Sequence, residues 1–279
     1  MWRIVHQKLL PFIFLSIGCL AILQCENSSG GDREEGTKES TNSTLITFRS
    51  DTLFQSSPQC ASDSNRCATV SLVFPYAESG PTQLCVDFNR LQLKYLKAMM
   101  QDVESVEPTS SLNLEGLMGA FLQDYAELLA DDPPFSMPWT MEIKGEILFQ
   151  NDKLITIQLE QYTFTGGAHP NSFTSIWMLD KKTGESLDFQ ELSAKTDTLL
   201  PLAEVAFRKA IELPITQTLA DAGYFQDEIF SLPQNYGLVE EGLLLYYNTY
   251  EVAPYVLGPT AVIIPIADLQ LVFETDNWY

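Results

Sequence analysis

Basic residues are scarce in this sequence, which has 16 lysines and arginines against 37 aspartates and glutamates and a net charge of −21. Proteins that bind nucleic acids cluster basic side chains against the phosphates, and the sequence has no such cluster. We therefore expect no nucleic-acid partner. The excess of negative charge keeps a chain soluble, and it also favours association with cationic proteins.

Histidine is scarcer still, with only His6 and His169 in 279 residues. This excludes a histidine-rich metal site. The sequence also lacks a phosphate-cradling glycine loop, a paired-histidine zinc helix, a GxSxG elbow and a CxxC pair. We predict no metal, no cofactor and no set of catalytic residues, so a binding or structural role is favoured over an enzymatic one.

Only one long apolar run precedes the folded part of the chain, from Leu9 to Leu23, and it follows Arg3 and Lys8. A basic start followed by such a run is typical of a secretory signal peptide, and the run is short for a membrane-spanning helix. Residues 26–44 are polar, glycine-rich and acidic, as in flexible linkers. We predict export, with residues 1–25 as the leader and 26–44 as a flexible acidic linker.

The apolar run ends near Cys25, and the polar linker follows this cysteine directly. The arrangement resembles a bacterial lipoprotein signal, which implies that Cys25 is acylated and begins the mature protein. Gln24 stands where that motif usually has a small residue, so Cys19, which follows Gly18, is the alternative lipidation site. An ordinary cleaved signal is a further interpretation. The resemblance implies an envelope protein that is lipid-anchored at the outer membrane or the periplasmic face.

Three of the five cysteines, Cys60, Cys67 and Cys85, lie beyond the predicted leader. In an oxidising compartment we expect two of them to pair. The short polar segment between Cys60 and Cys67 favours a disulfide between these two, and Cys67–Cys85 is the alternative. None of the three has a histidine nearby in the sequence, so we assign them structural roles.

Helix and strand patterns occur in blocks, without the regular alternation that builds a parallel sheet. Residues 84–104 and 114–129 have apolar side chains at helical spacing, and alternating segments around them indicate strands. The segment DDPPFSMP, residues 131–138, interrupts these patterns with three prolines. We predict an α+β fold with mostly antiparallel sheet in two lobes, a small domain over 45–132 and a second domain over 138–279.

The segment YTFTGGAHPNSF, residues 162–173, contains the most distinctive loop. Its two glycines permit left-handed backbone conformations, and the proline favours an extended conformation for His169 before it. A structural corner, a contact with a ligand or partner, and acid–base catalysis by His169 are all compatible with this pattern. The candidate binding residues in this loop are Gly166, Gly167, His169, Pro170 and Asn171.

A second candidate loop is TYEVAPYVLGP, residues 249–259. Its tyrosines, together with Trp278, could form an amphipathic surface. The prolines and the glycine of the same segment are equally typical of a turn between strands. We add Tyr250, Glu251 and Tyr255 to the candidate binding residues.

A family resemblance lies in YTFTGGAHPNSFTSIWMLDKKTGESLDFQEL, and further along the chain in FSLPQNYGL and YEVAPYVLGP. These stretches resemble the extracellular domain family shared by the deacetylase PdaC and the anti-sigma factor RsiV, over about residues 140–272. Residues 60–130 resemble the small domain that often precedes it. The resemblance implies an α+β envelope module and, through RsiV, the binding of lysozyme.

We expect neither deacetylation nor sigma-factor sequestration to carry over. The sequence shows no separate deacetylase domain, and only eight residues precede the apolar run where RsiV has a sigma-binding region. The expected function is a non-catalytic binding module for peptidoglycan or for a cationic wall-degrading protein such as lysozyme. A glycan hydrolase or esterase that uses His169, and a structural scaffold lipoprotein, are the alternatives.

Overall fold

The computed structural model describes residues 45–101, 112–132, 134, 137–187, 196–227 and 229–270. All of them belong to one compact unit, Asn42–Tyr279. The predicted leader and linker, the two candidate lipidation residues Cys19 and Cys25, and Trp278 lie outside the described residues. Among the helices that the structure describes, none combines the length and the apolar character needed to cross a membrane.

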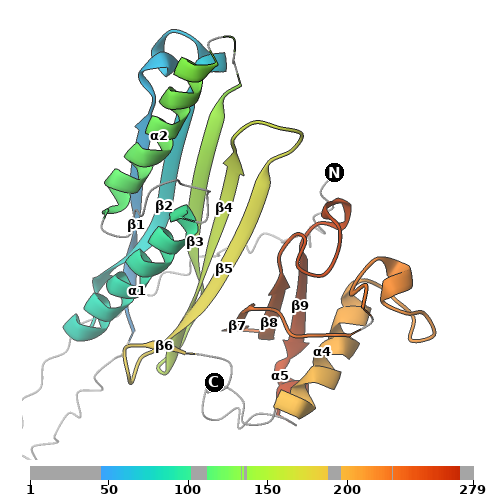
Figure 1. Ribbon diagram of the computed structural model, residues 1–279. Helices are drawn as coiled ribbons and strands as arrows, with labels where there is room; N and C mark the ends of the chain where they lie inside the picture. Colours follow the sequence, from blue (N-terminus) through green and yellow to red (C-terminus); the bar gives the residue numbers. More distant parts are fainter. Residues whose placement is uncertain are drawn as a thin grey trace, which may run out of the picture. The chain divides into compact units, whose positions relative to one another are not determined.

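Six strands form the larger sheet, in their order along the chain (Figure 1). They are β1 (Thr47–Ser56), β2 (Ala68–Ser79), β3 (Trp139–Gln150), β4 (Leu154–Phe164), β5 (Asn171–Asp180) and β6 (Ser186–Leu187). Neighbouring strands are antiparallel except for β2 and β3, which are parallel. A parallel pair requires a long crossover, and that crossover contains α1 (Thr82–Gln101) and α2 (Leu114–Asp131).

The larger sheet continues across the proline-rich segment at which the sequence suggests a boundary. β2 precedes that segment, β3 follows it, and the two strands pair from Ala68 opposite Trp139 to Val73 opposite Lys144. Helices α1 and α2 lie on the same face of the sheet (Figure 1), where Leu96 and Met118 are buried against β2, β3 and β4. The predicted α+β class is therefore confirmed, with helices from one lobe packed on a sheet that both lobes share.

Three antiparallel strands form a smaller sheet in the order β7–β8–β9. They are β7 (Asn235–Val239), β8 (Gly242–Tyr247) and β9 (Thr260–Pro265), accompanied by the helices α4 (Thr196–Ala210) and α5 (Ile266–Leu269). Short 3-10 turns occupy Pro58–Ala61, Ser64–Arg66, Ala220–Ala222 and Tyr255–Leu257. Phe207 of α4 is fully buried at the centre of this part of the core, with Leu243 and Val262 in the same cluster.

Contacts from β4 and β5 attach the smaller sheet to the larger one. The backbone N–H of Ile176 donates to the side-chain oxygen of Asn235 at 3.0 Å, and the Thr156 hydroxyl donates to the Leu238 carbonyl at 2.6 Å. A Cβ at Gly237 would lie 2.5 Å from the Thr156 methyl group, so only glycine permits this close approach. The Asn235 side chain of β7 thus occupies a backbone donor of β5 that would otherwise be open to another strand.

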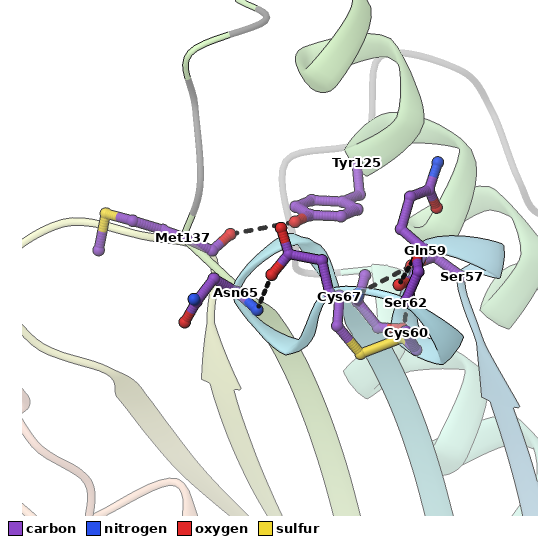
Figure 2. The surroundings of a disulfide bond; sticks show 10 residues. Ser57, Gln59, Cys60, Ser62, Asn65, Cys67, Tyr125 and Met137 are labelled. Atoms are coloured by element: carbon purple, nitrogen blue, oxygen red, sulfur yellow. Dashed lines mark hydrogen bonds between the residues drawn. A yellow bond between two sulfur atoms is a disulfide. The ribbon is translucent and has the colours of Figure 1, made fainter.

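A disulfide joins Cys60 to Cys67 in the connection between β1 and β2 (Figure 2). This is the pairing that the sequence favours over Cys67–Cys85. At the base of the loop the Ser57 N–H donates to the Ala68 carbonyl, and the Ala68 N–H donates to the Ser57 hydroxyl. Cys85 is a free thiol on α1, and burial raises its pKa. The disulfide therefore closes a loop whose base is already held by hydrogen bonds between Ser57 and Ala68.

Lys181, at the turn after β5, provides a pH-dependent contribution to stability. Its ammonium donates to the Gln150 side-chain oxygen at 3.1 Å, and partial burial lowers its pKa from 10.5 to about 8. Because the unfolded chain then binds more protons between pH 8 and 10.5, stability should rise with pH across this window. Urea unfolding of wild type and Lys181→Met at a series of pH values tests this. The difference in unfolding free energy between the two should change across the window, and a constant difference would contradict the assignment.

Candidate binding site

The first candidate loop connects β4 to β5 with an unusual backbone. Gly166 and Gly167 have φ angles of 95° and 94°, in the left-handed region that other residues avoid. Asn171 then begins β5 opposite Thr163. The two glycines allow the tight reversal between the strands, and His169 lies at the exposed end of the loop.

The second candidate loop connects β8 to β9 and contains a strained residue. Tyr250 has a φ of 70°, a conformation that typically costs a non-glycine residue about 1–2 kcal/mol. The side chain of Tyr250 is nevertheless 60% exposed, so burial of its ring does not explain the strain. Backbone strain of this kind is concentrated at binding and catalytic sites. A 3-10 turn at Tyr255–Leu257 then leads into β9.

The two loops meet through three aromatic side chains. The His169 and Tyr255 rings stack with their centroids 3.9 Å apart and their planes 21° apart. The Tyr250 hydroxyl lies 3.4 Å from His169 Nε2, and the Tyr255 hydroxyl donates to the Pro170 carbonyl at 3.3 Å. The loops are about 80 residues apart in the sequence, yet they form one surface, which we call the loop-pair site (residues 166–171 and 250–257).

Asn248 fastens the second loop to the strand that follows the first. Its side-chain oxygen accepts from the Thr174 N–H at 2.7 Å, and its amide nitrogen donates to the Thr174 carbonyl at 2.9 Å. The Asn248 N–H in turn donates to a carboxylate oxygen of Glu251 at 2.8 Å, and the other oxygen accepts from the Gln234 N–H at 3.4 Å. The predicted binding residue Glu251 therefore also holds the backbone of its own loop.

Replacing Asn248 with alanine should leave the Thr174 N–H and carbonyl without partners in a buried position. We expect the unfolding free energy to fall by about 2–4 kcal/mol, because each unsatisfied buried group typically costs 1–3 kcal/mol. Denaturant unfolding measures this, with Asn65→Ala at an exposed turn as the control. If the two variants were equally stable, the attachment of the loop to β5 would not depend on this side chain.

A groove adjoins Tyr250. Its volume is about 700 Å³, and its lining residues include Phe225, Asp227, Ile229, Tyr250 and Glu251. Phe225 also has a left-handed backbone, with φ of 47°, and its N–H donates to the Val252 carbonyl at 2.8 Å. Two of the strained residues of the described chain therefore line the same groove.

The groove and the aromatic cluster are acidic and apolar at once. Asp227 and Glu251 provide two carboxylates, and the described residues that line the groove include no lysine or arginine. Large apolar side chains, including Ile229 and Val256, are exposed beside Tyr250 and Tyr255. Within the part of the chain that the structure describes, no group of histidine, cysteine and acidic residues could hold a metal ion. The arrangement suits a partner that presents both positive charge and flat or apolar groups.

The candidate binding residues predicted from the sequence thus lie together in the structure. Some of them form the exposed aromatic surface, and others position it. His169, Tyr250 and Tyr255 form the aromatic cluster, and Pro170 contributes its carbonyl. The residues that position this cluster are Gly166, Gly167, Asn171 and Glu251. Three residues of the site were not predicted from the sequence: Asn248, Phe225 and Asp227. Of these, Asn248 directly precedes the candidate segment 249–259, and this position is the one signal that could have identified it.

Two family models match the chain. Residues 82–172 match the deacetylase PdaC, and residues 189–267 match a protein family of unknown function, DUF3298. The chain therefore carries a PdaC-like segment followed by a DUF3298 domain, and the resemblance inferred from the sequence is confirmed. The PdaC match contains the first candidate loop, residues 166–171, and the DUF3298 match contains the second, residues 250–257. The loop-pair site is built from both.

Solved structures share the fold. A DUF3298 family member from Bacteroides fragilis has a TM-score of 0.67 at 17% identity, over 83% of this chain and 95% of that chain. A DUF3298 family protein from Pseudomonas aeruginosa has a TM-score of 0.61 at 18% identity, over 84% of this chain and 97% of that chain. No curated protein matched the chain. At these identities the likeness establishes the fold.

Proposed function

We propose that this protein is a lipid-anchored binding module of the bacterial cell envelope, and that its partner is a cationic wall-degrading protein such as lysozyme. The loop-pair site and the adjoining groove make the contact. The observation that carries the proposal is the convergence of His169, Tyr250 and Tyr255 beside the carboxylates of Asp227 and Glu251. Exposed aromatic faces next to fixed carboxylates favour lysine and, above all, arginine side chains.

The charge of the whole chain supports the same kind of partner. A net charge of −21 attracts a basic protein over distances longer than the contact itself and accelerates the encounter. Peptidoglycan is the competing ligand, because sugar rings also lie against exposed aromatic side chains. The two ligands differ in their dependence on salt, since a contact made through charge weakens as ionic strength rises.

Calorimetric titration with hen egg-white lysozyme and with soluble peptidoglycan fragments, each at low and at high salt, tests the proposal. We expect lysozyme to bind and its affinity to fall as salt rises. Salt-insensitive binding of the fragments alone would assign the site to peptidoglycan. If neither ligand bound, the proposed function would be wrong.

Catalysis by His169 is the alternative hypothesis. The ring contacts the Tyr250 hydroxyl, the Pro170 carbonyl and the stacked Tyr255 ring. These contacts hold the ring as part of an aromatic surface. Assays of glycan hydrolysis and ester cleavage with wild type and His169→Ala separate the two roles. An activity that is present in wild type and abolished in the variant would establish the enzyme.

The lipid anchor is a separate part of the proposal and has its own test. We expect the chain from its native host to sediment with membranes and to carry acyl chains on Cys25, as judged by mass spectrometry. Cys25→Ser should release the protein from the membrane, because a stable anchor depends on the buried acyl chains. Acyl chains on Cys19 would instead move the lipidation site to the alternative cysteine. A soluble wild-type protein without acyl chains would contradict the anchor.

A further inference from the structure

β9 is an edge strand, and among the described strands it has a neighbour on one side alone. In the described chain β9 pairs only with β8, in a register that places Ile264 opposite Leu243. The Ile266 N–H donates to the Glu241 carbonyl, so the residues of even number direct their backbone groups toward β8. The backbone groups of Ala261 and Ile263 therefore point away from the sheet, where they can pair with another strand.

Prolines restrict pairing along this edge to a short window. Pro265 ends β9 and Pro259 precedes it, and neither residue has a backbone N–H. Within β9 the outward-facing donors are thus the N–H groups of Ala261 and Ile263. The carbonyls of the same two residues also face outward. These groups are self-complementary: in an antiparallel copy whose Val262 lies opposite Val262, Ala261 faces Ile263 of the other copy, and each N–H meets a carbonyl.

A groove runs along the same edge, between β9 and α4. Its volume is about 390 Å³, and its lining includes Leu202, Val205 and Ala206 of α4 together with Ile263 of β9. The Val205 side chain is 64% exposed and that of Ile263 is 44% exposed. A free strand edge beside an apolar helix flank is the arrangement in which domains take up an added strand.

The charge of the groove indicates which kind of strand can pair with β9. The described residues of its lining include one cation, Lys209, and one anion, Asp268, so these side chains balance in a chain whose net charge is −21. Two copies of such an acidic chain repel each other over most of their surface and approach most easily at a neutral, apolar patch. The groove is such a patch.

We propose that two copies of this chain associate through β9, with the strands antiparallel about a two-fold axis near Val262. The four outward-facing groups of each copy would form four hydrogen bonds with those of its partner. Val205 and Ile263 would be covered in both copies, because a two-fold interface uses the same surface twice. The β9 edge is separate from the loop-pair site, and the dimer does not depend on the function proposed for that site.

Sedimentation velocity of the purified full chain over a concentration series tests the dimer. Ile263→Pro removes one outward N–H without removing a hydrogen bond to β8, and Val205→Glu adds a charge to the groove. Both variants should weaken self-association by about tenfold or more. Val86→Glu is the matched control, because Val86 is also an exposed helical valine, at 53%, on α1. It should associate as wild type does.

Hydrogen exchange of the wild type distinguishes this interface from any other. The amides of Ala261 and Ile263 should be protected at high protein concentration and lose that protection on dilution. A wild type that is monomeric throughout the series would overturn the proposal. A dimer that both groove variants leave intact, or one without concentration-dependent protection of these amides, would overturn it as well.

Discussion

Phe207→Ala should lower the free energy of unfolding by about 3–5 kcal/mol, the range found when a fully buried aromatic side chain is removed. Phe207 is 0% exposed, and its ring contacts those of Tyr224, Phe225, Phe230 and Tyr247 at centroid distances of 5.2–5.7 Å. Edge-to-face contacts of this kind contribute beyond the buried area. The variant removes all four contacts at once and leaves a cavity between α4 and the smaller sheet.

Denaturant unfolding monitored by circular dichroism measures this loss, and Phe54→Ala is the matched control. Phe54 is 63% exposed on β1, so its replacement should change stability by no more than about 0.5 kcal/mol. Because Phe225 both contacts Phe207 and lines the groove, Phe207→Ala should also weaken ligand binding at the loop-pair site. Equal stability of the two phenylalanine variants would contradict the packing described for this core.

Tyr250→Ala should weaken binding of the cationic partner by about tenfold to a hundredfold and leave folding nearly unchanged. The ring of Tyr250 is exposed, contacts His169 and lies beside Asp227 and Glu251, so its loss removes the contact surface but little core packing. Tyrosine is enriched among the few interface residues whose truncation costs about 2 kcal/mol or more of affinity. Calorimetric titration with lysozyme measures the change.

Two further variants make this result specific. Tyr76→Ala removes an exposed tyrosine that contacts Arg49 on the larger sheet, and it should bind as wild type does. Tyr250→Gly should lose affinity as Tyr250→Ala does, but it should be more stable than the alanine variant by about 1 kcal/mol, because glycine tolerates the left-handed backbone. If Tyr250→Ala bound as tightly as Tyr76→Ala, Tyr250 would not be part of the contact.

Local patterns were sufficient to predict most of the elements of the fold. Apolar spacing placed helices over 84–104 and 114–129, and the structure has them at Thr82–Gln101 and Leu114–Asp131. The parallel pairing of β2 with β3 was not predictable in this way, because no local pattern records which distant strand a strand will join. The prolines between α2 and β3 therefore suggested a boundary between two domains. In the structure the chain returns at this point to the larger sheet, where β3 pairs with β2.

The sequence was sufficient to predict the two loops of the candidate site, but not that they come together. Two glycines and a proline around His169, and the tyrosines near Pro254, identified both loops from composition alone. Their convergence depends on the hydrogen bonds between Asn248 and Thr174, two polar residues that carry no signal of their own in the sequence. The groove includes Phe225, whose positive φ accompanies a hydrogen bond to the distant Val252 and is not indicated by the residue type.

Hydrogen–deuterium exchange of the full chain, with and without lysozyme, most directly tests whether the loop pair is one binding surface. Residues 166–171 and 250–257 should become protected together, with the same dependence on lysozyme concentration, and the protection should be lost in Tyr250→Ala. Protection of only one loop, or protection confined to another surface while both loops exchange freely, would contradict it.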